Sequence, residues 1–363
     1  MQRFAALLDG GFRSAGHETW LIRPPVVVGT LPARGTAAKW LGYADQFFVF
    51  PTLLKKAVAW ADVVHICDHS NSFYMKYVQH RPHVVTCHDM LAIRSALGEI
   101  ACHRTAWTGR RLQNMILRGL QSAGNTGHIA CVSQATVVDV LRVAGVPRKR
   151  VSKIFNGLNF PYSPLDPQQA QKEIEKFRIQ PNQRFILHVG GNSWYKNRLG
   201  AIKVFSALKS RPEGRQLSLV MAGQSFTGEI RRFLRKEPCG QDVMELHNPT
   251  SEELRALYSR ADLMLFPSLE EGFGWPIVEA QACGCPVVTS DREPMTEVGG
   301  TAATYIDPNE VHLAASVIAR QIRARSRPCE ESVRNAERFS ASAMIRHYAD
   351  LYERLYRQST GHC

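Results

Sequence analysis

The sequence predicts an α/β protein with two doubly wound domains, each built on a parallel sheet. Its 363 residues exceed what one ordinary hydrophobic core organises and suit two domains. Short runs of Val, Ile and Leu alternate with stretches of helical spacing along the whole chain. A stretch rich in proline and polar residues interrupts this alternation near the middle of the chain. Two βαβ domains joined by a linker explain all three observations.

The predicted strands form two series. Continuous apolar runs of this length fit parallel strands that are buried on both faces. The first series is 63–67, 84–87, 128–132 and 151–155, and the second is 185–189, 217–222, 243–246, 263–266, 286–289 and 303–306. The helical segments between them indicate βαβ units.

Domain boundaries follow from the proline-rich stretch. Residues 157–183 contain Pro161, Pro164, Pro167 and Pro181 among many polar residues, which is typical of a linker. We therefore predict a first domain at 1–158, a linker at 159–180 and a second domain at 181–339. The final segment, 340–363, has apolar residues at helical spacing and predicts a helix that could cross back to the first domain.

The amino terminus departs from the usual pattern of a doubly wound domain. Residues 1–14 read as a helix, and the first strand is expected only near Trp20. Such a domain usually opens on a strand and a glycine-rich turn, so the opening strand is missing from the sequence. We expect the reading frame to extend upstream and to supply that strand, which would make the longer chain more stable.

The charge balance limits the classes of partner. Lys and Arg number 45 against 32 Asp and Glu, a formal net charge of +13. A basic surface attracts nucleic acid, anionic membranes or phosphorylated small molecules. No nucleic-acid-binding motif accompanies the basic groups, so we predict no nucleic-acid partner. The basic helical stretch 104–120, with Trp107 and Met115, could dock on anionic lipid, although covering the sheet is its better interpretation. The overall charge still predicts weak, salt-sensitive membrane association.

The nine cysteines are scattered and include no C-x-x-C pair. We find no secretory signal and no apolar run near the ~18 residues that a membrane span requires. These features predict reduced thiols and a cytoplasmic protein, which could lie peripherally at the inner face of the cytoplasmic membrane.

The densest motif is the stretch 261–280, which reads as strand, loop and helix. Pro276 suits the first helical turn, and Gly272 and Gly274 allow the backbone to turn tightly and approach a ligand. Free N–H groups and the positive end of the helix dipole then face the carboxyl edge of the sheet, where phosphate binds in α/β folds. A glycine loop by itself is more often just the start of an ordinary capped helix. A phosphate site is predicted here only from the loop together with the residues around it.

Two carboxylates flank this loop. Glu271 lies in the loop, and Glu279 lies one turn into the helix, eight positions later. Because carboxylates accept hydrogen bonds, they suit sugar hydroxyls. The spacing suggests one glutamate for each of two polyhydroxyl rings on either side of a diphosphate.

A second phosphate candidate is the stretch 187–198, where a strand again leads into glycines and a helix. Lys196 could reach a phosphate there, although a lone lysine is more often simply solvated. The chain has no D-x-D pair of the kind that often holds a divalent ion, no G-x-x-x-x-G-K and no dinucleotide fingerprint, since Ile277 stands where a small residue is needed. Lys196 and the helix terminus must then supply the positive field, and no metal or other cofactor is expected.

These motifs resemble a known family. The stretch F-P-S-L-E-E-G-F-G-W-P-I-V-E-A-Q-A-C-G-C-P-V-V from Phe266 looks like the hallmark of family-four retaining glycosyltransferases, which have two facing Rossmann-like domains with the active site in the cleft between them (the GT-B fold). V-S-Q-A from Val132, F-N-G-L from Phe155, H-V-G from His188 with Lys196 and Asn197, and L-V-M-A-G from Leu219 resemble other family segments. The resemblance covers nearly the whole chain.

The resemblance implies roles for the donor-side residues. Glu271 would contact the transferred sugar and Glu279 the ribose hydroxyls. The amides of Gly272, Phe273, Gly274 and Trp275 would hold phosphate or sugar, the phosphate loop would comprise Gly190, Gly191 and Lys196, and the nucleobase would lie near His247, Asn248 and Thr250. The family usually has an arginine where this chain has Gly191. Either Arg198 substitutes for it, or the phosphate is held less tightly.

The first domain contributes one candidate. His88 follows the strand 84–87 in T-C-H-D, which resembles the family's T-x-H-D segment, whose histidine lies beside the sugar. For a lone histidine a structural role is about equally expected before the resemblance is considered. With it, Glu271, Lys196 and His88 form the candidate catalytic set.

The sequence thus predicts a retaining hexosyltransferase of polysaccharide, lipopolysaccharide or glycolipid assembly. Its partners would be a nucleoside-diphosphate sugar as co-substrate and a carbohydrate or lipid-linked glycan acceptor. A nucleotide-sugar epimerase or phosphorylase of the same architecture and a non-catalytic nucleotide-sugar-binding protein are the alternatives. Glu271→Gln is expected to lower turnover and to leave nucleotide binding almost unchanged, whereas Glu279→Gln should weaken donor and nucleotide binding.

Overall fold

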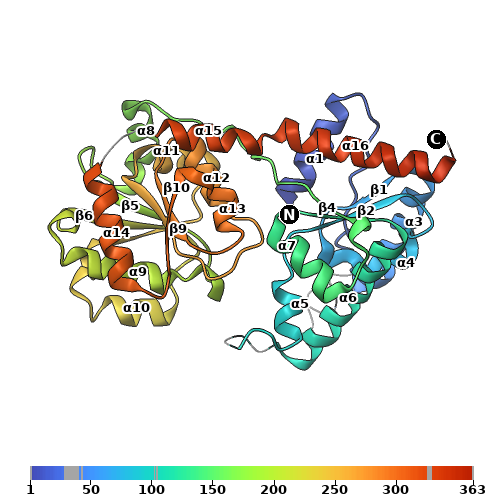
Figure 1. Ribbon diagram of the computed structural model, residues 1–363, viewed down its shortest axis with the longest axis horizontal. Helices are drawn as coiled ribbons and strands as arrows, with labels where there is room; N and C mark the ends of the chain where they lie inside the picture. Colours follow the sequence, from blue (N-terminus) through green and yellow to red (C-terminus); the bar gives the residue numbers. More distant parts are fainter. Residues whose placement is uncertain are drawn as a thin grey trace. The chain divides into compact units, whose positions relative to one another are not determined.

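The computed structural model describes residues 2–27, 41, 44–101, 103, 105–324 and 329–361. The chain folds into two compact units (Figure 1). Unit 1 comprises residues 1–159 and 341–363, and unit 2 comprises residues 160–340. Each unit has its own parallel sheet covered by helices, which confirms the predicted α/β class.

Unit 1 contains a four-stranded sheet in the order β1-β2-β3-β4, with every pair parallel. The strands are β1 (Val64–Ile66), β2 (His83–Cys87), β3 (His128–Cys131) and β4 (Val151–Lys153). They confirm the four strands of the first predicted series. Every residue of β2 and β3 is buried, as expected of central parallel strands.

Helices cover both faces of this sheet (Figure 1). They are α1 (Gln2–Ser14), α3 (Phe50–Trp60), α4 (Met75–Val78), α5 (Leu91–Ala96), α6 (Trp107–Thr126), α7 (Gln134–Asp139) and α16 (Ala341–Thr360), with short 3-10 or π turns at Asp45–Val49 (η2), His69–Tyr74 (η3), Val140–Ala144 (η4) and Arg148–Arg150 (η5). Val85 and Ile129 join an apolar core with α3 and α6. The alternate residue Thr86 faces α16.

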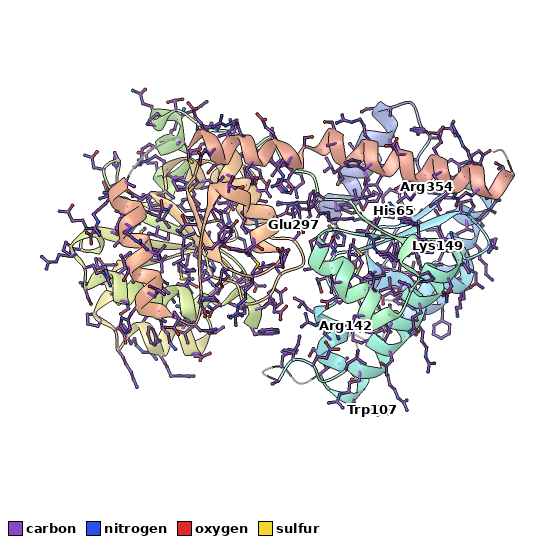
Figure 2. The ribbon with its side chains drawn as sticks, in the orientation of Figure 1. His65, Trp107, Arg142, Lys149, Glu297 and Arg354 are labelled. Atoms are coloured by element: carbon purple, nitrogen blue, oxygen red, sulfur yellow. The ribbon has the colours of Figure 1, made fainter. Side chains whose placement is uncertain are left out.

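The final helix is bound to the sheet of unit 1 by polar contacts. His65 Nδ1 is hydrogen-bonded to the Tyr352 hydroxyl, and His65 Nε2 lies 2.7 Å from Thr86 Oγ1. The Tyr348 hydroxyl lies 2.8 Å from the same Thr86 oxygen. Burial lowers the pKa of His65 to about 3, so the imidazole is neutral at pH 7. Figure 2 shows His65 beneath α16, which is therefore part of unit 1.

The amino-terminal prediction was half right. The helix at 1–14 is confirmed as α1, but the strand expected near Trp20 was wrong, because residues 17–26 have no strand partner in the described structure. Instead, Arg13 donates to the Thr19 carbonyl at 3.2 Å, and the Thr19 hydroxyl donates to Asp9 at 2.5 Å. These bonds hold the segment to α1 rather than to the sheet.

Unit 2 contains a six-stranded parallel sheet in the order β10-β9-β8-β5-β6-β7. The strands are β5 (Arg184–Val189), β6 (Leu217–Gly223), β7 (Val243–His247), β8 (Leu263–Phe266), β9 (Val287–Ser290) and β10 (Ala303–Ile306), which confirm the second predicted series. From β5 the chain builds outward to β7 and then returns to add β8 on the other side of β5. This reversal is the topological switch point at which open α/β sheets bind ligands.

Helices also cover both faces of the unit 2 sheet (Figure 1). They are α8 (Pro167–Ile174), α9 (Arg198–Lys209), α10 (Gly228–Leu234), α11 (Ser251–Arg260), α12 (Trp275–Ala282), α13 (Met295–Gly299), α14 (Val311–Ala324) and α15 (Glu330–Ala336), with 3-10 turns at Glu175–Phe177 (η6), Trp194–Lys196 (η7), Pro212–Gly214 (η8), Pro238–Asp242 (η9), Gly300–Ala302 (η10) and Glu337–Phe339 (η11). Among the described helices, none is long and apolar enough to cross a membrane.

Most of the stretch assigned to a linker, 159–180, is folded into unit 2. Asp166 caps α8 by accepting the N–H groups of Gln168 and Gln169, and Pro167 opens the helix. Ala170 and Ile174 are buried on the inner side of α8, which packs on α11. The proline that suggested a linker is therefore the first residue of a helix, where its missing N–H has no cost.

Replacing either of two glycines in unit 1 helices by alanine should change the free energy of unfolding in opposite directions. Gly119 of α6 lies against η3, and a Cβ there would be 2.2 Å from the Ser72 carbonyl oxygen. Gly119→Ala should lower the free energy of unfolding by about 1–3 kcal/mol, because the helix must move away. A Cβ on Gly10 of α1 meets nothing within 4 Å, so Gly10→Ala should raise it by about 0.5–1 kcal/mol. Urea unfolding of both variants tests this, and shifts in the same direction would contradict it.

Candidate functional site

The loops that follow β5 and β8 are joined at the switch point of unit 2. The Leu269 N–H donates to the Tyr195 carbonyl at 2.7 Å, and Asn197 Nδ2 donates to the Pro267 carbonyl at 3.0 Å. Asn197 has a left-handed backbone with φ of 50°, which asparagine tolerates better than most residues. A Cβ on Gly200 would lie 2.3 Å from the Asn197 side chain, so this glycine leaves room for the contact. The two loops therefore form one continuous surface.

An ion pair joins the same two loops. Lys196 Nζ lies 2.7 Å from Glu271 Oε1, and their side chains are 19% and 7% exposed. The ammonium also lies 5.1 Å from the centroid of the Phe266 ring. The structure thus brings together two of the predicted catalytic residues, one from each side of the switch point.

The glycine turn 272–274 leads into α12 at the same edge of the sheet. Gly274 has φ of 99°, a conformation that only glycine adopts easily, and Pro276 stands in the first turn of α12. Phe273 is buried edge-on against Phe339, with ring centroids 5.6 Å apart. Trp275 has a buried indole Nε1 without a hydrogen-bond partner among the described residues. Pro276 has no N–H and the Ile277 N–H donates to the Gly274 carbonyl at 3.0 Å, so this edge offers an anion the Trp275 N–H and the positive end of the helix dipole.

Glu279 is held in place from α11. It is buried, and its carboxylate accepts a hydrogen bond of 2.9 Å from the Tyr258 hydroxyl. Burial raises the pKa of Tyr258 well above its ordinary value, and the Glu279 charge adds to the shift. The hydroxyl therefore stays protonated and donates to the carboxylate. No pattern in the sequence pointed to Tyr258, because its contact with Glu279 depends on the packing of α11 against α12.

The carboxyl ends of β5, β6 and β7 approach one another closely. The Gly190 N–H donates to the Ala222 carbonyl at 3.0 Å, and the Asn248 N–H donates to the Gly223 carbonyl at 2.9 Å. Gly223 has φ of 143°, and a Cβ there would be 2.2 Å from the Gly190 carbonyl oxygen. Only glycine fits at 223, so the backbone of the loop after β5 rests directly on the neighbouring strand.

Beneath this loop lies a buried histidine that the sequence analysis did not single out as a site residue. His188 Nδ1 donates to the Leu265 carbonyl at 3.0 Å, since a carbonyl oxygen can only accept. Burial lowers the pKa of His188 to about 3, so the ring is neutral and Nε2 carries no proton. Its Nε2 would lie 3.2 Å from a Cβ on Gly190. A larger residue at 190 would therefore crowd this ring.

Arg198 is hydrogen-bonded to residues of the loops that follow β5 and β6. It is 4% exposed, and its Nη1 donates to Asn192 Oδ1 at 2.5 Å and to the Gln224 carbonyl at 2.7 Å. Gln224 Oε1 accepts the Asn192 N–H at 2.8 Å and would lie 3.1 Å from a Cβ on Gly191. The Nε and Nη2 atoms of Arg198 are buried without a hydrogen-bond partner among the described residues, so the guanidinium has donors that these two bonds do not use. Buried Arg198 therefore does not occupy the place of the arginine that the family usually has at the position of Gly191.

The three predicted nucleobase residues have different environments. His247 is exposed at the end of β7, with Nδ1 3.1 Å from Ser225 Oγ. Asn248 has a left-handed backbone with φ of 39°. Thr250 caps α11, because its hydroxyl accepts the Glu253 N–H while the Glu253 carboxylate accepts the Thr250 N–H. The Thr250 side chain is therefore already engaged in its own helix.

His88 belongs to unit 1, whereas the other predicted site residues belong to unit 2. It follows β2, is buried, and its Nε2 is hydrogen-bonded to the Cys67 carbonyl at 3.0 Å. Burial lowers the pKa of His88 to about 4, so the ring is neutral at pH 7 with its proton on Nε2. Phe4 packs edge-on to the ring at 4.9 Å. Nδ1 is then an acceptor of fixed orientation.

Within the described ranges, no group of three or more His, Cys, Asp or Glu side chains is arranged to hold a metal ion.

Comparison with known proteins accounts for both units. Residues 2–160 match the family described as Glycosyltransferase Family 4, and residues 169–339 match Glycosyl transferases group 1. The chain belongs to the family-4 glycosyltransferases. HepE of Anabaena, in a crystal structure with UDP and glucose, aligns with a TM-score of 0.69 at 18% identity over 89% of this glycosyltransferase and 84% of HepE. This likeness confirms the predicted GT-B fold class.

Curated relatives match part of the glycosyltransferase. The O-antigen chain mannosyltransferase B of Escherichia coli is 26% identical over 195 residues, which are 53% of this chain and 51% of the relative. The putative glycosyltransferase EpsF of Bacillus subtilis is 31% identical over 240 residues, 64% of this chain and 61% of the relative. The matched region thus spans about half to three fifths of these relatives.

The Tyr258–Glu279 contact makes a testable prediction for the glycosyltransferase. Tyr258→Phe removes a hydrogen bond to a buried carboxylate, so the free energy of unfolding should fall by about 1.5–3 kcal/mol. Tyr195→Phe, a change of the same kind beside Lys196, is the matched control and should have a smaller effect. Chemical denaturation of the two variants decides this. Equal stability of Tyr258→Phe and the parent protein would show that Glu279 does not depend on the hydroxyl.

Proposed function

We propose that this glycosyltransferase moves a hexosyl unit from a nucleoside-diphosphate sugar to an acceptor hydroxyl with retention of anomeric configuration. The observation that supports this most is the Lys196–Glu271 pair beside the start of α12. A cation and the positive end of a helix dipole suit a diphosphate, and a carboxylate suits the hydroxyls of the sugar attached to it. Both lie at the switch point, where this class of sheet binds nucleotides.

Each part of the donor has a proposed partner. Lys196 and the amides of 272–275 would hold the diphosphate, and Glu271 would hold the transferred sugar. Glu279, oriented by Tyr258, would accept the ribose hydroxyls. His247 and the backbone at Asn248 would flank the base. His88 would present its Nδ1 as an acceptor to a hydroxyl of the sugar.

The reaction needs no enzymic nucleophile in this proposal. The bond between the anomeric carbon and the diphosphate oxygen breaks, and a bond from the acceptor oxygen to that carbon forms. The proton of the acceptor hydroxyl passes to the leaving diphosphate on the same face of the sugar, which gives retention. Lys196 would stabilise the negative charge that develops on the leaving diphosphate.

The biological setting follows from the relatives. An O-antigen chain mannosyltransferase among the relatives supports a role in assembly of a polysaccharide or lipopolysaccharide. We therefore infer a carbohydrate or lipid-linked glycan acceptor and a cytoplasmic site of action. Since one relative is a mannosyltransferase and the HepE structure contains UDP, GDP-mannose and UDP-glucose are the first donors to test.

Donor binding and the role of Glu279 can be tested together. A bound donor at ~100 times its dissociation constant should stabilise the protein by about 2.7 kcal/mol, which a thermal shift detects. Glu279→Gln should weaken the affinity for the donor and for its nucleoside diphosphate by about 10- to 150-fold, since a charge-assisted hydrogen bond is lost. Glu310→Gln, an exposed residue of unit 2, is the control with the same change of charge.

The outcomes separate this function from its alternatives. Transfer of the sugar to an added glycan acceptor would support the proposal. Phosphate-dependent turnover would indicate a phosphorylase, epimerised donor an epimerase, and donor binding without any turnover a binding protein. No stabilisation by any nucleotide sugar would contradict a nucleotide-sugar site altogether.

Metal dependence provides a separate prediction. The chain has no D-x-D pair, and Lys196 with the positive end of the α12 dipole offers a positive field for the diphosphate. Transfer assayed with excess chelator should proceed at nearly the rate without it. A strict requirement for added magnesium or manganese would contradict this interpretation.

The outer side of α6 supports a membrane proposal. Its inner residues Ile116 and Leu120 are buried on the sheet, while Trp107 is 63% exposed. Figure 2 shows Trp107 at the outer end of the helix. The Arg111 guanidinium lies 3.8 Å from the Trp107 ring centroid, and α6 contains three arginines but no Asp or Glu. We propose that this face docks weakly on anionic lipid headgroups.

Flotation with vesicles of anionic lipid tests this proposal. Binding at low salt should fall when salt is raised, because basic residues near the surface contribute about 1 kcal/mol each through screened attraction. A Trp107→Ser, Arg111→Ser variant should float less than the parent, and Arg323→Ser of unit 2 is the control for loss of charge. Equal flotation of all three proteins, or none with the parent, would remove the proposal.

A further inference from the structure

The Lys196–Glu271 contact has a consequence for which ligands the site holds. A diphosphate at the switch point and the Glu271 carboxylate need the same ammonium. We propose that Glu271 competes with the diphosphate for Lys196, so that the site discriminates the intact sugar donor from the nucleoside diphosphate product. This inference rests on the proposed function and adds a role for Glu271 besides holding the sugar.

The surroundings make this competition strong. Both groups are shielded from water, with 7% of the Glu271 side chain exposed, so their attraction is screened less than that of a surface pair. The bonds from Leu269 to Tyr195 and from Asn197 to Pro267 hold the two loops together. Because the backbones are fixed in this way, the two charges separate by side-chain rotation rather than by opening of the loops.

The neighbouring cation is less accessible to a ligand than Lys196. Arg198 is 4% exposed, and its Nη1 is bound to Asn192 and Gln224, while its Nε and Nη2 have no hydrogen-bond partner among the described residues. Gly191 adds no side chain where an arginine could have shared the diphosphate. The affinity for a diphosphate therefore depends strongly on whether Lys196 is released by Glu271.

The intact donor and the product differ in what they offer Glu271. A donor brings sugar hydroxyls that can donate to the carboxylate when Lys196 turns to the diphosphate. The product brings the diphosphate alone and leaves a buried carboxylate beside an anion with neither cation nor donor, which is costly. Glu271 then favours return to Lys196, which weakens product binding and promotes its release.

The ion pair changes the expectation for Glu271→Gln stated from the sequence. Instead of leaving nucleotide binding unchanged, the substitution should tighten it, because the amide neither pairs with Lys196 as a carboxylate does nor repels the diphosphate. We expect the dissociation constants of UDP and GDP, whichever the parent binds, to fall about tenfold, equivalent to about 1.4 kcal/mol. The affinity for the matching donor, UDP-glucose or GDP-mannose, should not improve to the same extent, because a charged acceptor for its sugar is lost.

Calorimetry with nucleoside diphosphate and donor, on the parent, Glu271→Gln and the control Glu310→Gln, tests the inference. The ratio of donor affinity to product affinity should fall in Glu271→Gln and stay at the parental value in the control. Product inhibition of sugar transfer should become stronger in the same variant. If Glu271→Gln does not purify as a folded protein, Glu271→Asp should change the ratio in the same direction, since the shorter side chain withdraws the carboxylate from Lys196.

The outcomes distinguish the inference from the function beneath it. If the parent binds nucleotides but Glu271→Gln binds the diphosphate no more tightly, the competition is overturned while the proposed function stands. An unchanged ratio of donor to product affinity would also overturn it. If the parent binds neither UDP nor GDP nor their sugars, the proposed function fails, and the inference fails with it.

Discussion

The reversal of strand order between β5 and β8 is the constraint on which the candidate site depends. All six strands of unit 2 run parallel, so their following loops emerge at the same edge of the sheet. Where neighbouring strands of such a sheet lead into helices on the same face, the loops between strand and helix lie over one another. At the switch point the chain leaves β5 and β8 in opposite directions, and the two loops border an open edge. Lys196 and Glu271 meet there, 75 residues apart in sequence.

Close backbone packing turns this edge into a fixed surface. Gly223 and Gly200 leave space for the Gly190 carbonyl and the Asn197 side chain, so the loops rest on the strand ends and on each other. Polar contacts behind the surface are equally specific, since Tyr258 reaches Glu279 from a different helix and Arg198 ties Asn192 to Gln224. The backbone of these loops is therefore positioned before any ligand binds, which reduces the entropy lost on binding.

In unit 1, packing of helices α1 and α16 on the sheet fixes the position of the candidate residue His88. The side of its sheet opposite the α6 core is covered by α1 and by α16, two helices from opposite ends of the chain. Buried His65 and Thr86 would be costly without partners, and the hydroxyls of Tyr348 and Tyr352 supply them. The same layer includes Phe4, whose ring packs against the neutral His88. The position of His88 thus depends on residues from both chain termini.

Local pattern was enough to predict the ten strands of the described residues, the α1 helix, the glycine turn at 272–274 and the two loops that contain Lys196 and Glu271. These features repeat within a few residues, because burial of a parallel strand and the turn into a helix each require a short, recognisable run. The Pro167 signal was misread because proline suits a linker and a helix start equally well, and only the packing of α8 on α11 decides between them. The strand expected near Trp20 failed for a similar reason, since strand formation needs a partner that local sequence does not contain.

What only the tertiary structure decided is which side chains meet. The sequence by itself determined that a cation, two carboxylates and a glycine-rich helix start belong to this protein, and that they follow parallel strands. Strand order then decided that Lys196 pairs with Glu271, helix packing decided that Tyr258 holds Glu279, and the close approach of β5 to β6 decided that Arg198 turns toward Gln224. These contacts join residues from 21 to 75 positions apart. Their energies depend on distance and burial in space, which spacing along the chain does not encode.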